Sequence, residues 1–401
     1  MDLTLFGKQA TGDLVTVRGS DPALGSWEHK AFLPHGLPDS MPQLSMDTVL
    51  SLGNARSALA ALDNTARHLP NPQLLRQPTL RQEAQSTSAL EGTYAPLSDV
   101  VTADVEHAAT PEIREILNYV RMANHGYAAQ AAGRSLSTTL LNELQGILMS
   151  GTPLEAESGR LRRSQVIIGR QEGATPGAPP IEAARFVPVP PGDQLAAGVD
   201  ELMKWKASDH IGRIDPLIKA GMAHYQFETL HPYRDGNGRL GRYLIVMDLQ
   251  ALGLLSEPTL MVSPWFEARR TDYYDQLLRV STDGDWDSFL RFFAQGLDQA
   301  AVSTHRQMLR LGTVQAELKD TVRSSTIRSE SAHAMVDLAT AQPTFTAAIA
   351  ARELGLSTGG ARKIIDQLVD VGVLQVLDPD STYRRRYLAP RIVEVLLERD
   401  G

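Results

Sequence analysis

Apolar residues recur at three- and four-residue steps along most of the chain, and this spacing is typical of amphipathic helices. The first run consists of Val49, Leu52, Ala55, Leu59 and Leu62. The same spacing predicts a helix that begins at Gln194 and further helices over 80–90, 110–132, 138–148, 214–229, 243–252, 272–280, 288–309 and 313–324. The pattern therefore predicts a mainly α fold.

Two segments break the helical pattern. Residues 1–45 contain four prolines and no periodicity, so they are expected to form an irregular arm. Residues 164–169 and 185–187 have strand-like sequences on either side of a turn region rich in glycine and proline. This arrangement predicts a β-hairpin, which we call the flap.

The pattern changes again in residues 330–401. Short helices are expected over 334–340, 345–354 and 357–371, followed by a hairpin with strands at 372–377 and 383–388. This order resembles a small winged helix-turn-helix. Its third helix carries Arg362 and Lys363, and its wing carries Arg384, Arg385 and Arg386, which are placed to contact phosphate. The segment has a net charge of −2, unlike a strong DNA binder, so both DNA and protein remain as its partners.

The composition narrows the chemistry. The 401 residues include 39 Lys and Arg, 47 Asp and Glu, and no Cys, which gives a net charge of −8. Disulfides, thiolate metal sites and a cysteine nucleophile are therefore excluded. The acidic balance does not steer the whole chain toward nucleic acid or a membrane surface. No signal peptide and no apolar run long enough to span a bilayer is recognisable, so a cytoplasmic protein without membrane contact is expected.

Residues 231–242 concentrate chemically versatile side chains: His231, Asp235, three glycines and three arginines. The glycine spacing also fits a dinucleotide fingerprint, but that fingerprint follows a strand, and here a helical pattern precedes it. A calcium loop needs Gly where Leu240 stands. A structural hairpin turn would leave the arginines unexplained. An anion site is the interpretation that the residues favour.

The physical case for an anion site combines backbone and side-chain donors. Glycines allow backbone N–H groups to converge on a phosphate, and a helix that starts near residue 237 adds its N-terminal dipole. Arg239 and Arg242 lie three apart on one helix face and can bind further phosphate oxygens. Asp235 is an oxygen ligand suited to magnesium. His231 is the natural acceptor for a hydroxyl proton near neutral pH.

The segment resembles the motif of the Fic family, H-x-F-x-[D/E]-G-N-G-R-x-x-R, and Tyr233 is the one departure. The resemblance implies a Fic-type helical core and a protein adenylyltransferase, which moves AMP from ATP to a Ser, Thr or Tyr hydroxyl and releases pyrophosphate. It implies His231 as the general base and Asp235 as the Mg²⁺ ligand. The residues implied in nucleotide binding are Asp235, Gly236, Asn237, Gly238, Arg239, Leu240, Gly241, Arg242, Val166, Ile167, Ile168, Gly169, Tyr273 and Tyr274.

The resemblance also implies how a target is held and how activity is limited. The flap would hold an extended target segment by strand-like backbone bonds. Thr87, Glu91 and Gly92 match the inhibitory pattern [S/T]-x-x-x-E-[G/N] of the family. Alone, this pattern favours a solvated helix end, where Gly92 caps the helix after Glu91. Within a Fic-like chain it implies that Glu91 pairs with Arg242 and occupies the space of the γ-phosphate.

Several alternatives stay open. The implied organisation is an arm (1–45), a helical region with the inhibitory motif (46–108), a catalytic core (109–312), and a linker helix with the winged helix (313–401). The enzyme could modify itself as well as a target protein, and a homodimer contact could bury the inhibitory motif. Transfer of UMP or phosphocholine, removal of AMP, and a nucleotide-sensing transcriptional regulator that binds DNA are the competing functions.

Overall fold

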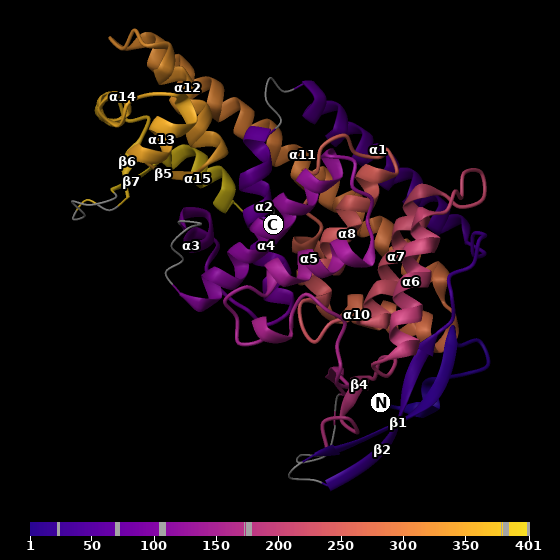
Figure 1. Ribbon diagram of the computed structural model, residues 1–401. Coiled ribbons are helices and arrows are strands. Elements are labelled where there is room, and N and C mark those ends of the chain that lie inside the picture. The colour runs from indigo at the N-terminus through magenta and orange to yellow at the C-terminus, as the bar shows by residue number, and fades with distance from the viewer. Residues whose placement is uncertain are drawn as a thin grey trace. The chain divides into compact units, whose positions relative to one another are not determined.

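The computed structural model describes residues 1–21, 25–68, 73–103, 110–171, 173, 179–377, 379 and 385–398; for residues 21 and 73–75 it describes the backbone alone. Helices dominate the described residues, and three small antiparallel sheets accompany them (Figure 1). This confirms the mainly α fold class. None of the described helices is long and apolar enough to cross a membrane.

The helices are α1 (Met46–His68), α2 (Gln73–Leu90), α3 (Leu97–Thr102), α4 (Pro111–Ala131), α5 (Thr138–Leu148), α6 (Asp193–Ala207), α7 (Pro216–Leu230), α8 (Asn237–Ala251), α9 (Ser263–Ala268), α10 (Arg270–Asp283), α11 (Trp286–Ser324), α12 (Glu330–Ala341), α13 (Ala347–Leu354), α14 (Thr358–Asp370) and α15 (Pro390–Leu397). The strands are β1 (Gly12–Asp21), β2 (Gly25–Pro34), β3 (Ile168–Arg170), β4 (Ala184–Phe186), β5 (Thr344–Thr346), β6 (Gln375–Val376) and β7 (Arg386–Leu388). The two helices expected over 288–309 and 313–324 are one continuous helix, α11.

The chain forms two compact units, each assembled from three separate segments. The first unit contains Met1–Ser57, Arg121–Leu254 and Trp265–Asp298. The second contains Ala58–Val120, Leu255–Pro264 and Gln299–Gly401. The four-part organisation expected from the sequence remains a prediction, apart from its irregular arm, which is corrected below.

The helix pair α7 and α8 lies at the centre of the first unit. α7 begins at Pro216 after Asp215, whose carboxylate accepts a hydrogen bond from the Leu217 N–H at 2.8 Å. Asp215 is therefore the N-cap of α7, and proline occupies the first helical position, where its missing N–H costs no hydrogen bond. The two helices come so close at Gly241 that a β-carbon there would overlap the Glu228 carboxylate. The close approach fixes where the loop between α7 and α8 stands.

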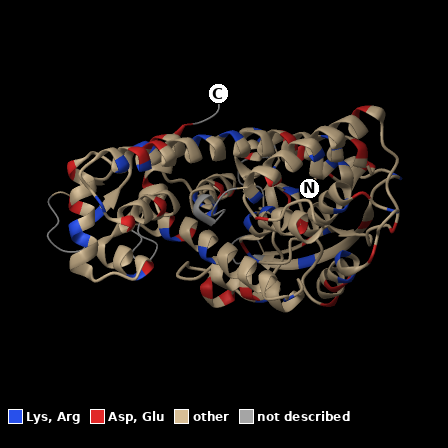
Figure 2. Cartoon of the chain, turned by 90° about the horizontal axis from the view of Figure 1, so that it is seen from above, with Lys and Arg blue, Asp and Glu red and all other residues tan. Residues whose placement is uncertain are grey.

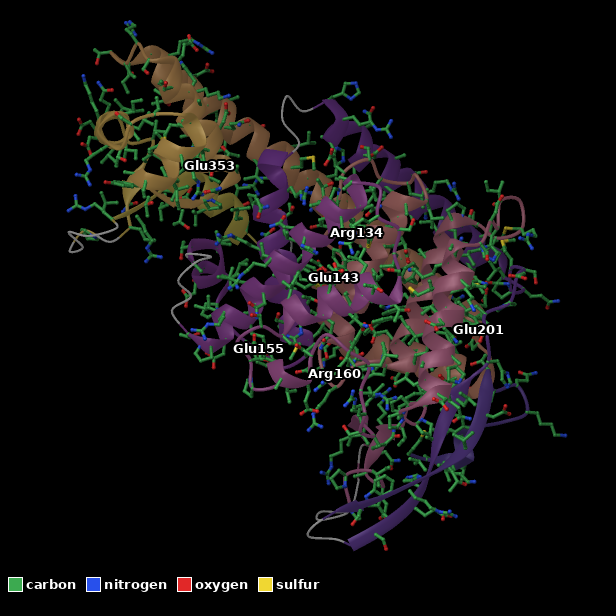
Figure 3. The ribbon with its side chains drawn as sticks, viewed as in Figure 1. Arg134, Glu143, Glu155, Arg160, Glu201 and Glu353 are labelled. Atoms are coloured by element: carbon green, nitrogen blue, oxygen red, sulfur yellow. The ribbon has the colours of Figure 1, made fainter. Side chains whose placement is uncertain are left out.

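A bidentate ion pair ties the connection between α4 and α5. Both guanidinium nitrogens of Arg134 contact the Glu143 carboxylate, at 3.0 and 2.9 Å, and both residues are labelled in Figure 3. α5 itself starts at an N-cap, Ser137, whose hydroxyl accepts from the Leu140 N–H. The capped and tethered α5 presents its side chains to the α7–α8 loop.

The expectation of an irregular arm over residues 1–45 was wrong for the part that contains β1 and β2, whereas residues 35–45 contain no helix or strand. β1 and β2 pair antiparallel over ten residues each, from Gly12 opposite Pro34 to Asp21 opposite Gly25. Proline misled because Pro34 is the last residue of β2, where it ends the strand instead of interrupting it. We call this pair the N-terminal hairpin.

The N-terminal hairpin packs against the flap in a hydrophobic cluster. The Phe32 N–H donates to the Val187 carbonyl at 2.8 Å, and the Phe32 ring centre lies 5.5 Å from that of Phe186. The remaining buried members are Met1, Val17, Ala31, Ile181 and Ala184. The flap is therefore supported by a second hairpin.

The flap is shorter than expected. β3 pairs with β4 through Ile168 opposite Phe186 and Arg170 opposite Ala184. Val166 and Ile167, expected within the first strand, precede β3 and belong to no strand. Most of the expected turn, including residues 174–178, lies outside the described residues.

The second unit contains α2 and the C-terminal elements. Buried Arg81 of α2 donates to three backbone carbonyls, those of Val100, Val101 and Ala103, at 2.8–2.9 Å, and so fixes α3 and the residue after it. In the C-terminal part, α12, α13 and α14 accompany a three-stranded sheet of order β5-β7-β6. This is the element order of the expected winged helix, with an added strand β5 and helix α15. The assignment as a winged helix stays a prediction.

Candidate functional site

The α7–α8 loop, residues 231–236, is framed by two left-handed residues. His231 ends α7 with φ 48° and ψ 60°, and it is the single non-glycine residue with positive φ in the described part of the chain. Gly236, with φ 83°, precedes α8. A left-handed non-glycine residue costs about 1 kcal/mol and persists where the surroundings impose it. The loop thus holds His231 in a fixed, strained backbone geometry.

The ring of His231 is half-buried and oriented by its own helix. Its Nδ1 lies 3.3 Å from the Glu228 carbonyl oxygen. A carbonyl oxygen only accepts, so this contact favours the tautomer with the proton on Nδ1. Nε2 is then the unprotonated nitrogen, which is the state a general base requires.

Arg162 is a site residue that sequence reasoning missed. Its side chain donates to the carbonyls of His231 (2.9 Å), Ser164 (3.4 Å), Val189 and Leu230, and its backbone N–H donates to the Pro232 carbonyl at 3.0 Å. Burial lowers the pKa of Arg162 to about 10, so it stays charged at neutral pH. One guanidinium therefore links the α7–α8 loop to both ends of the flap.

Asp235 faces solvent from the same loop. Its Oδ1 accepts from the Gly236 N–H at 2.5 Å and lies 3.2 Å from the Arg239 guanidinium, while its side chain is 43% exposed. Gln145 of α5 fixes the loop from behind by donating to the Asp235 carbonyl at 3.1 Å and accepting from the Gly159 N–H. The described residues contain no group of three or more His, Asp or Glu arranged for a metal. A single exposed carboxylate nevertheless fits Mg²⁺, which takes most of its ligands from water and phosphate.

Gly236, Asn237 and Gly238 have different structural roles at the start of α8. A β-carbon on Gly236 would lie 2.9 Å from Leu148, in addition to its left-handed backbone, so glycine is required there. Asn237 and Gly238 open α8, whose first N–H groups have no partner within the helix. The Asn237 amide bonds both the N–H and the carbonyl of Tyr233, at 2.8 and 2.9 Å. Its side chain closes the loop, and its expected part in nucleotide binding stays a prediction.

The departure from the expected motif, Tyr233, is satisfied inside the fold. Its ring is fully buried, its hydroxyl donates to the Asn142 side-chain oxygen at 2.9 Å, and burial raises the pKa of Tyr233. The added hydroxyl therefore has a dedicated partner on α5.

Replacing Tyr233 with phenylalanine is expected to destabilise the protein by roughly 1 kcal/mol, because the Asn142 oxygen loses its donor. Denaturant unfolding of the variant measures this difference. The matched control is Tyr94→Phe, since Tyr94 is exposed. Equal loss of stability in both variants would show that the Asn142 bond contributes nothing.

The arginines of the motif are buried. Arg239 and Arg242 are at most 1% exposed, and Leu240 and Gly241 are buried beside them. The Arg239 guanidinium lies near Asp235 and near the Met149 sulfur at 3.9 Å. Fixed, desolvated guanidinium groups next to the helix start make this end of α8 strongly attractive to anions.

Of the two tyrosines that the resemblance implies in nucleotide binding, Tyr273 is a core residue. It is 1% exposed, and its hydroxyl lies 2.8 Å from His224 Nε2. His224 Nδ1 donates to the Gly241 carbonyl at 3.2 Å. Tyr274 is half-buried, with the Arg270 guanidinium over its ring. Tyr274 remains the candidate for base contact, while Tyr273 and His224 support α8.

Buried His224 is expected to make stability pH-dependent. Burial, and secondarily the nearby Arg242 charge, lowers the pKa of His224 from 6.5 to about 3. As the pH falls below 6.5 the unfolded chain binds this proton first, so the free energy of unfolding falls by about 1.4 kcal/mol per pH unit from this group until the pH approaches 3. Denaturant titrations at a series of pH values measure the free energy of unfolding. Between pH 6.5 and 5 this free energy should fall less steeply with pH in His224→Gln than in the wild type. Equal slopes would contradict the assignment.

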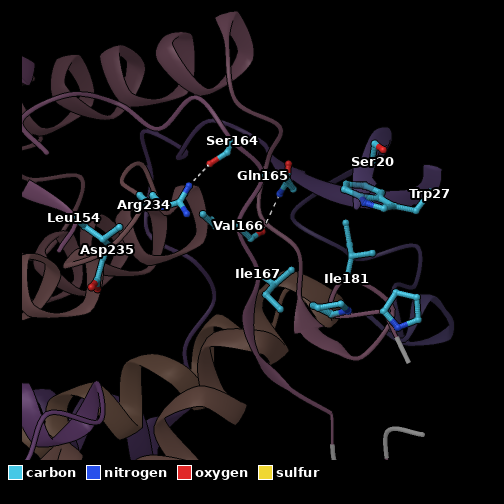
Figure 4. Close-up of a pocket in the computed structure, with 12 residues that line it drawn as sticks. Ser20, Trp27, Leu154, Ser164, Gln165, Val166, Ile167, Ile181, Arg234 and Asp235 are labelled. Carbon is cyan, nitrogen blue, oxygen red and sulfur yellow. Dashed lines mark hydrogen bonds between the residues drawn. The ribbon is translucent and has the colours of Figure 1, made fainter. Parts of the chain in front are cut away.

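A cleft in the first unit opens beside the α7–α8 loop. Its volume is ≈ 540 Å³, and it is lined by Ser20, Trp27, Leu154, Ser164, Gln165, Val166, Ile167, Pro179, Pro180, Ile181, Arg234 and Asp235. Figure 4 shows Arg234 and Asp235 on one side of it, residues 164–167 in the middle, and Trp27 and Ile181 on the other side. The flap residues Val166 and Ile167 are thus brought to Asp235, whereas Ile168 and Gly169 are not among the lining residues.

The expected inhibitory residues lie at the end of α2 in the second unit. Thr87 is fully buried, whereas Glu91 and Gly92 are exposed. Gly92 has φ 94°, and the Thr93 N–H reaches back to the Ser88 carbonyl at 3.0 Å, which ends the helix. The motif therefore places one buried hydroxyl on the last turn of α2 and one exposed carboxylate directly after it.

The basic residues expected to meet DNA are only partly available. Arg362 and Lys363 of α14 are exposed, as is Arg385. Arg386 instead donates to the Thr102 carbonyl of α3 at 3.1 Å, and Arg384 lies outside the described residues. Basic and acidic segments are interspersed along the chain in Figure 2. DNA binding stays a prediction without further support.

Comparison with protein-family models gives two matches. A model described as Fic/DOC family N-terminal matches residues 49–128, and one described as Fic/DOC family matches residues 135–249. The second match includes the α7–α8 loop and most of α8. Together the matches contain both the inhibitory residues and the motif segment.

Known relatives agree with these matches. Protein adenylyltransferase Fic of Drosophila erecta is 32% identical over 138 residues, which are 34% of this chain and 23% of that relative. The protein of the same name from Drosophila ananassae is 26% identical over 262 residues, 64% of this chain and 47% of that relative. The chain spans less than half the length of these curated relatives. A crystal structure of a Fic family protein from Desulfovibrio desulfuricans G20 has a TM-score of 0.54 at 22% identity, covering 87% of this chain and 97% of that one, which supports the fold.

Proposed function

The chain belongs to the Fic/DOC family, and from this membership we propose that it is a protein adenylyltransferase, which moves AMP from ATP to a hydroxyl of a target protein. The observation that carries the proposal is the α7–α8 loop, which presents His231, Asp235 and the start of α8 within a few residues. The name that the curated relatives share supports the same activity.

The proposed reaction is an in-line displacement at the α-phosphorus. The target hydroxyl gives its proton to His231 Nε2 while its oxygen bonds to the α-phosphorus. The bond from that phosphorus to the oxygen bridging to the β-phosphate breaks, and pyrophosphate leaves. Hydrogen bonding of Nδ1 to the Glu228 carbonyl keeps the ring in the accepting tautomer. Positioning and charge neutralisation supply most of the remaining catalysis.

The phosphates would lie at the start of α8. The first N–H groups of that helix, at Gly238 and Arg239, point where an anion is stabilised by the helix dipole. The guanidinium groups of Arg239 and Arg242 would neutralise further phosphate charge. Asp235 would hold Mg²⁺, which would neutralise charge on the phosphate oxygens. Arg162 is a positioning residue, because it holds the His231 carbonyl and the flap ends together.

The flap would present the target. Val166 and Ile167 line the cleft next to Asp235, and β3 has no neighbouring strand on its outer side among the described residues. An extended segment of the target could bond to this edge and bring its hydroxyl over His231. Glu91 would act as a brake by pairing with Arg242 in the place of the γ-phosphate.

Two ATP preparations test the proposal, one labelled on the α-phosphate and the other on the γ-phosphate. Purified protein with Mg²⁺ and a mixture of candidate proteins should incorporate label from the α-phosphate of ATP and none from the γ-phosphate. Mass spectrometry should then place AMP on Ser, Thr or Tyr side chains. Label from the γ-phosphate would indicate phosphorylation, and loss of AMP from a modified protein without any incorporation would indicate the reverse reaction. Either result would overturn the proposal.

A further inference from the structure

The cleft beside the α7–α8 loop has an apolar end that the proposed chemistry does not use. At one end stand Arg234 and Asp235. Trp27 and Ile181 lie at the other end, Ile167 lies between them and the charged end, and none of these three side chains is charged (Figure 4). Ile167 is 37% exposed and Trp27 is half-buried, so both keep apolar surface toward the cleft. A charged end and an apolar end within one cleft describe a site for an amphipathic ligand, not for a nucleotide alone.

The N-terminal hairpin, which lies outside the regions matched to the family models, supplies Trp27 to the apolar end. Trp27 of β2 stands opposite Gly19 of β1, and a β-carbon on Gly19 would overlap the indole. The ring therefore lies across the glycine and is held against one face of the hairpin. The same hairpin is fixed to the flap through the Phe32–Val187 hydrogen bond. Trp27 thus has a set position relative to Ile181 and the flap.

We propose that this cleft docks an extended segment of the target protein that carries an aromatic or branched aliphatic residue near the modified hydroxyl. The apolar side chain would lie against Trp27, Ile167 and Ile181, while the hydroxyl lies at the Asp235 end. The inference rests on the proposed adenylyl transfer and names the substrate class of that site. Trp27 is then a specificity-determining residue, and the N-terminal hairpin is part of the target-binding surface.

Three features favour a peptide over other occupants. The cleft is bordered along its length by residues 164–167, and in the described part of the chain the Val166 and Ile167 N–H groups make no backbone hydrogen bond. A peptide main chain can bond to such an edge, which a small apolar molecule cannot. The volume of ≈ 540 Å³ is that of a few side chains. The cleft reaches Asp235, so the docked segment would lie next to the residue proposed to hold Mg²⁺.

Direct binding of peptides tests the inference independently of catalysis. Purified His231→Ala protein is incubated with a library of fluorescent peptides that have a central Ser, Thr or Tyr and varied flanking residues. We expect retained peptides to be enriched in aromatic or branched aliphatic flanking residues. Trp27→Ala and Ile167→Ser, each in the same background, should weaken the best peptide about tenfold or more, and Trp27→Phe should weaken it less. Ile211→Ala is the matched control, because Ile211 is 89% exposed and distant in sequence from the cleft residues.

The outcomes separate this inference from the proposed function. Absence of enrichment, enrichment for charged flanking residues, or unchanged affinity in both Trp27→Ala and Ile167→Ser would overturn it. Ile167→Ser guards against a collapse of the hairpin, since Ile167 lies outside the hairpin. Apolar selection without any AMP transfer by Glu91→Gly protein would refute the adenylyltransferase and keep the docking cleft. AMP transfer to peptides without apolar preference would support the adenylyltransferase and refute the docking inference.

Discussion

His231→Ala protein is expected to transfer AMP about 10²- to 10⁴-fold more slowly than the wild type, which is the range that general-base catalysis supplies. The target hydroxyl has no other histidine in the α7–α8 loop to accept its proton. The loss should appear in the rate of transfer at saturating ATP, because the proposed role of His231 concerns the proton and not the nucleotide. Time courses of AMP incorporation from labelled ATP measure it.

A second variant is needed because the backbone conformation of His231 is left-handed. Its left-handed conformation is unfavourable for alanine but well tolerated by asparagine, so His231→Asn keeps the loop while removing the base. Both variants should lose transfer, and both should bind ATP with an affinity close to that of the wild type. His68→Ala serves as the control, since His68 is exposed in the second unit. Substantial transfer by His231→Asn would refute the assignment of the base.

The motif and its helices could be predicted because they depend on local chemistry. Helical spacing around 214–229 and glycine next to aspartate at 235–236 are visible in any short window of sequence. The structure placed α7 and the start of α8 within a few residues of those expectations. The sequence did not predict the tautomer of His231, although the contact that favours it is local, with Glu228 three residues away in the chain.

The hydrogen bonds that hold the α7–α8 loop could not be predicted from the sequence, because the residues that make them are distant from the loop in the chain. Arg162 bonds carbonyls up to 69 residues away, and Asn142 bonds Tyr233 across 91 residues. Such contacts follow from packing and leave no periodic trace. The strand β1 of the N-terminal hairpin does have an alternating pattern, in which apolar Val15 and Val17 alternate with polar Thr16 and Arg18. The prolines of this region nevertheless led to the expectation of an irregular segment. The bonds of the Asn237 amide to Tyr233, which close the loop, could not be predicted from its residue type either.

Glu91→Gly protein is expected to transfer AMP about 5- to 150-fold faster than the wild type, the range of typical coupling between two sites. The proposed brake places the Glu91 carboxylate against Arg242, where the γ-phosphate of ATP would otherwise lie. Removal of the carboxylate frees that space and lets ATP adopt the reactive pose. Glu91 follows the last residue of α2 and is exposed, so its replacement leaves the buried face of the helix unchanged. Initial rates of transfer under identical ATP and Mg²⁺ measure the gain.

Nucleotide affinity distinguishes this brake from a general loosening of the fold. AMP lacks the γ-phosphate, so its affinity should be equal in wild-type and Glu91→Gly protein, whereas ATP should bind the variant more tightly. Glu91→Gln should reproduce most of the gain, because the argument depends on charge. Asp99→Gly, at an exposed acidic residue of the same unit, should leave the transfer rate unchanged. If AMP and ATP affinities rise together, or if Asp99→Gly activates as strongly, Glu91 does not compete with the γ-phosphate, and the solvated helix end is the correct interpretation of the motif.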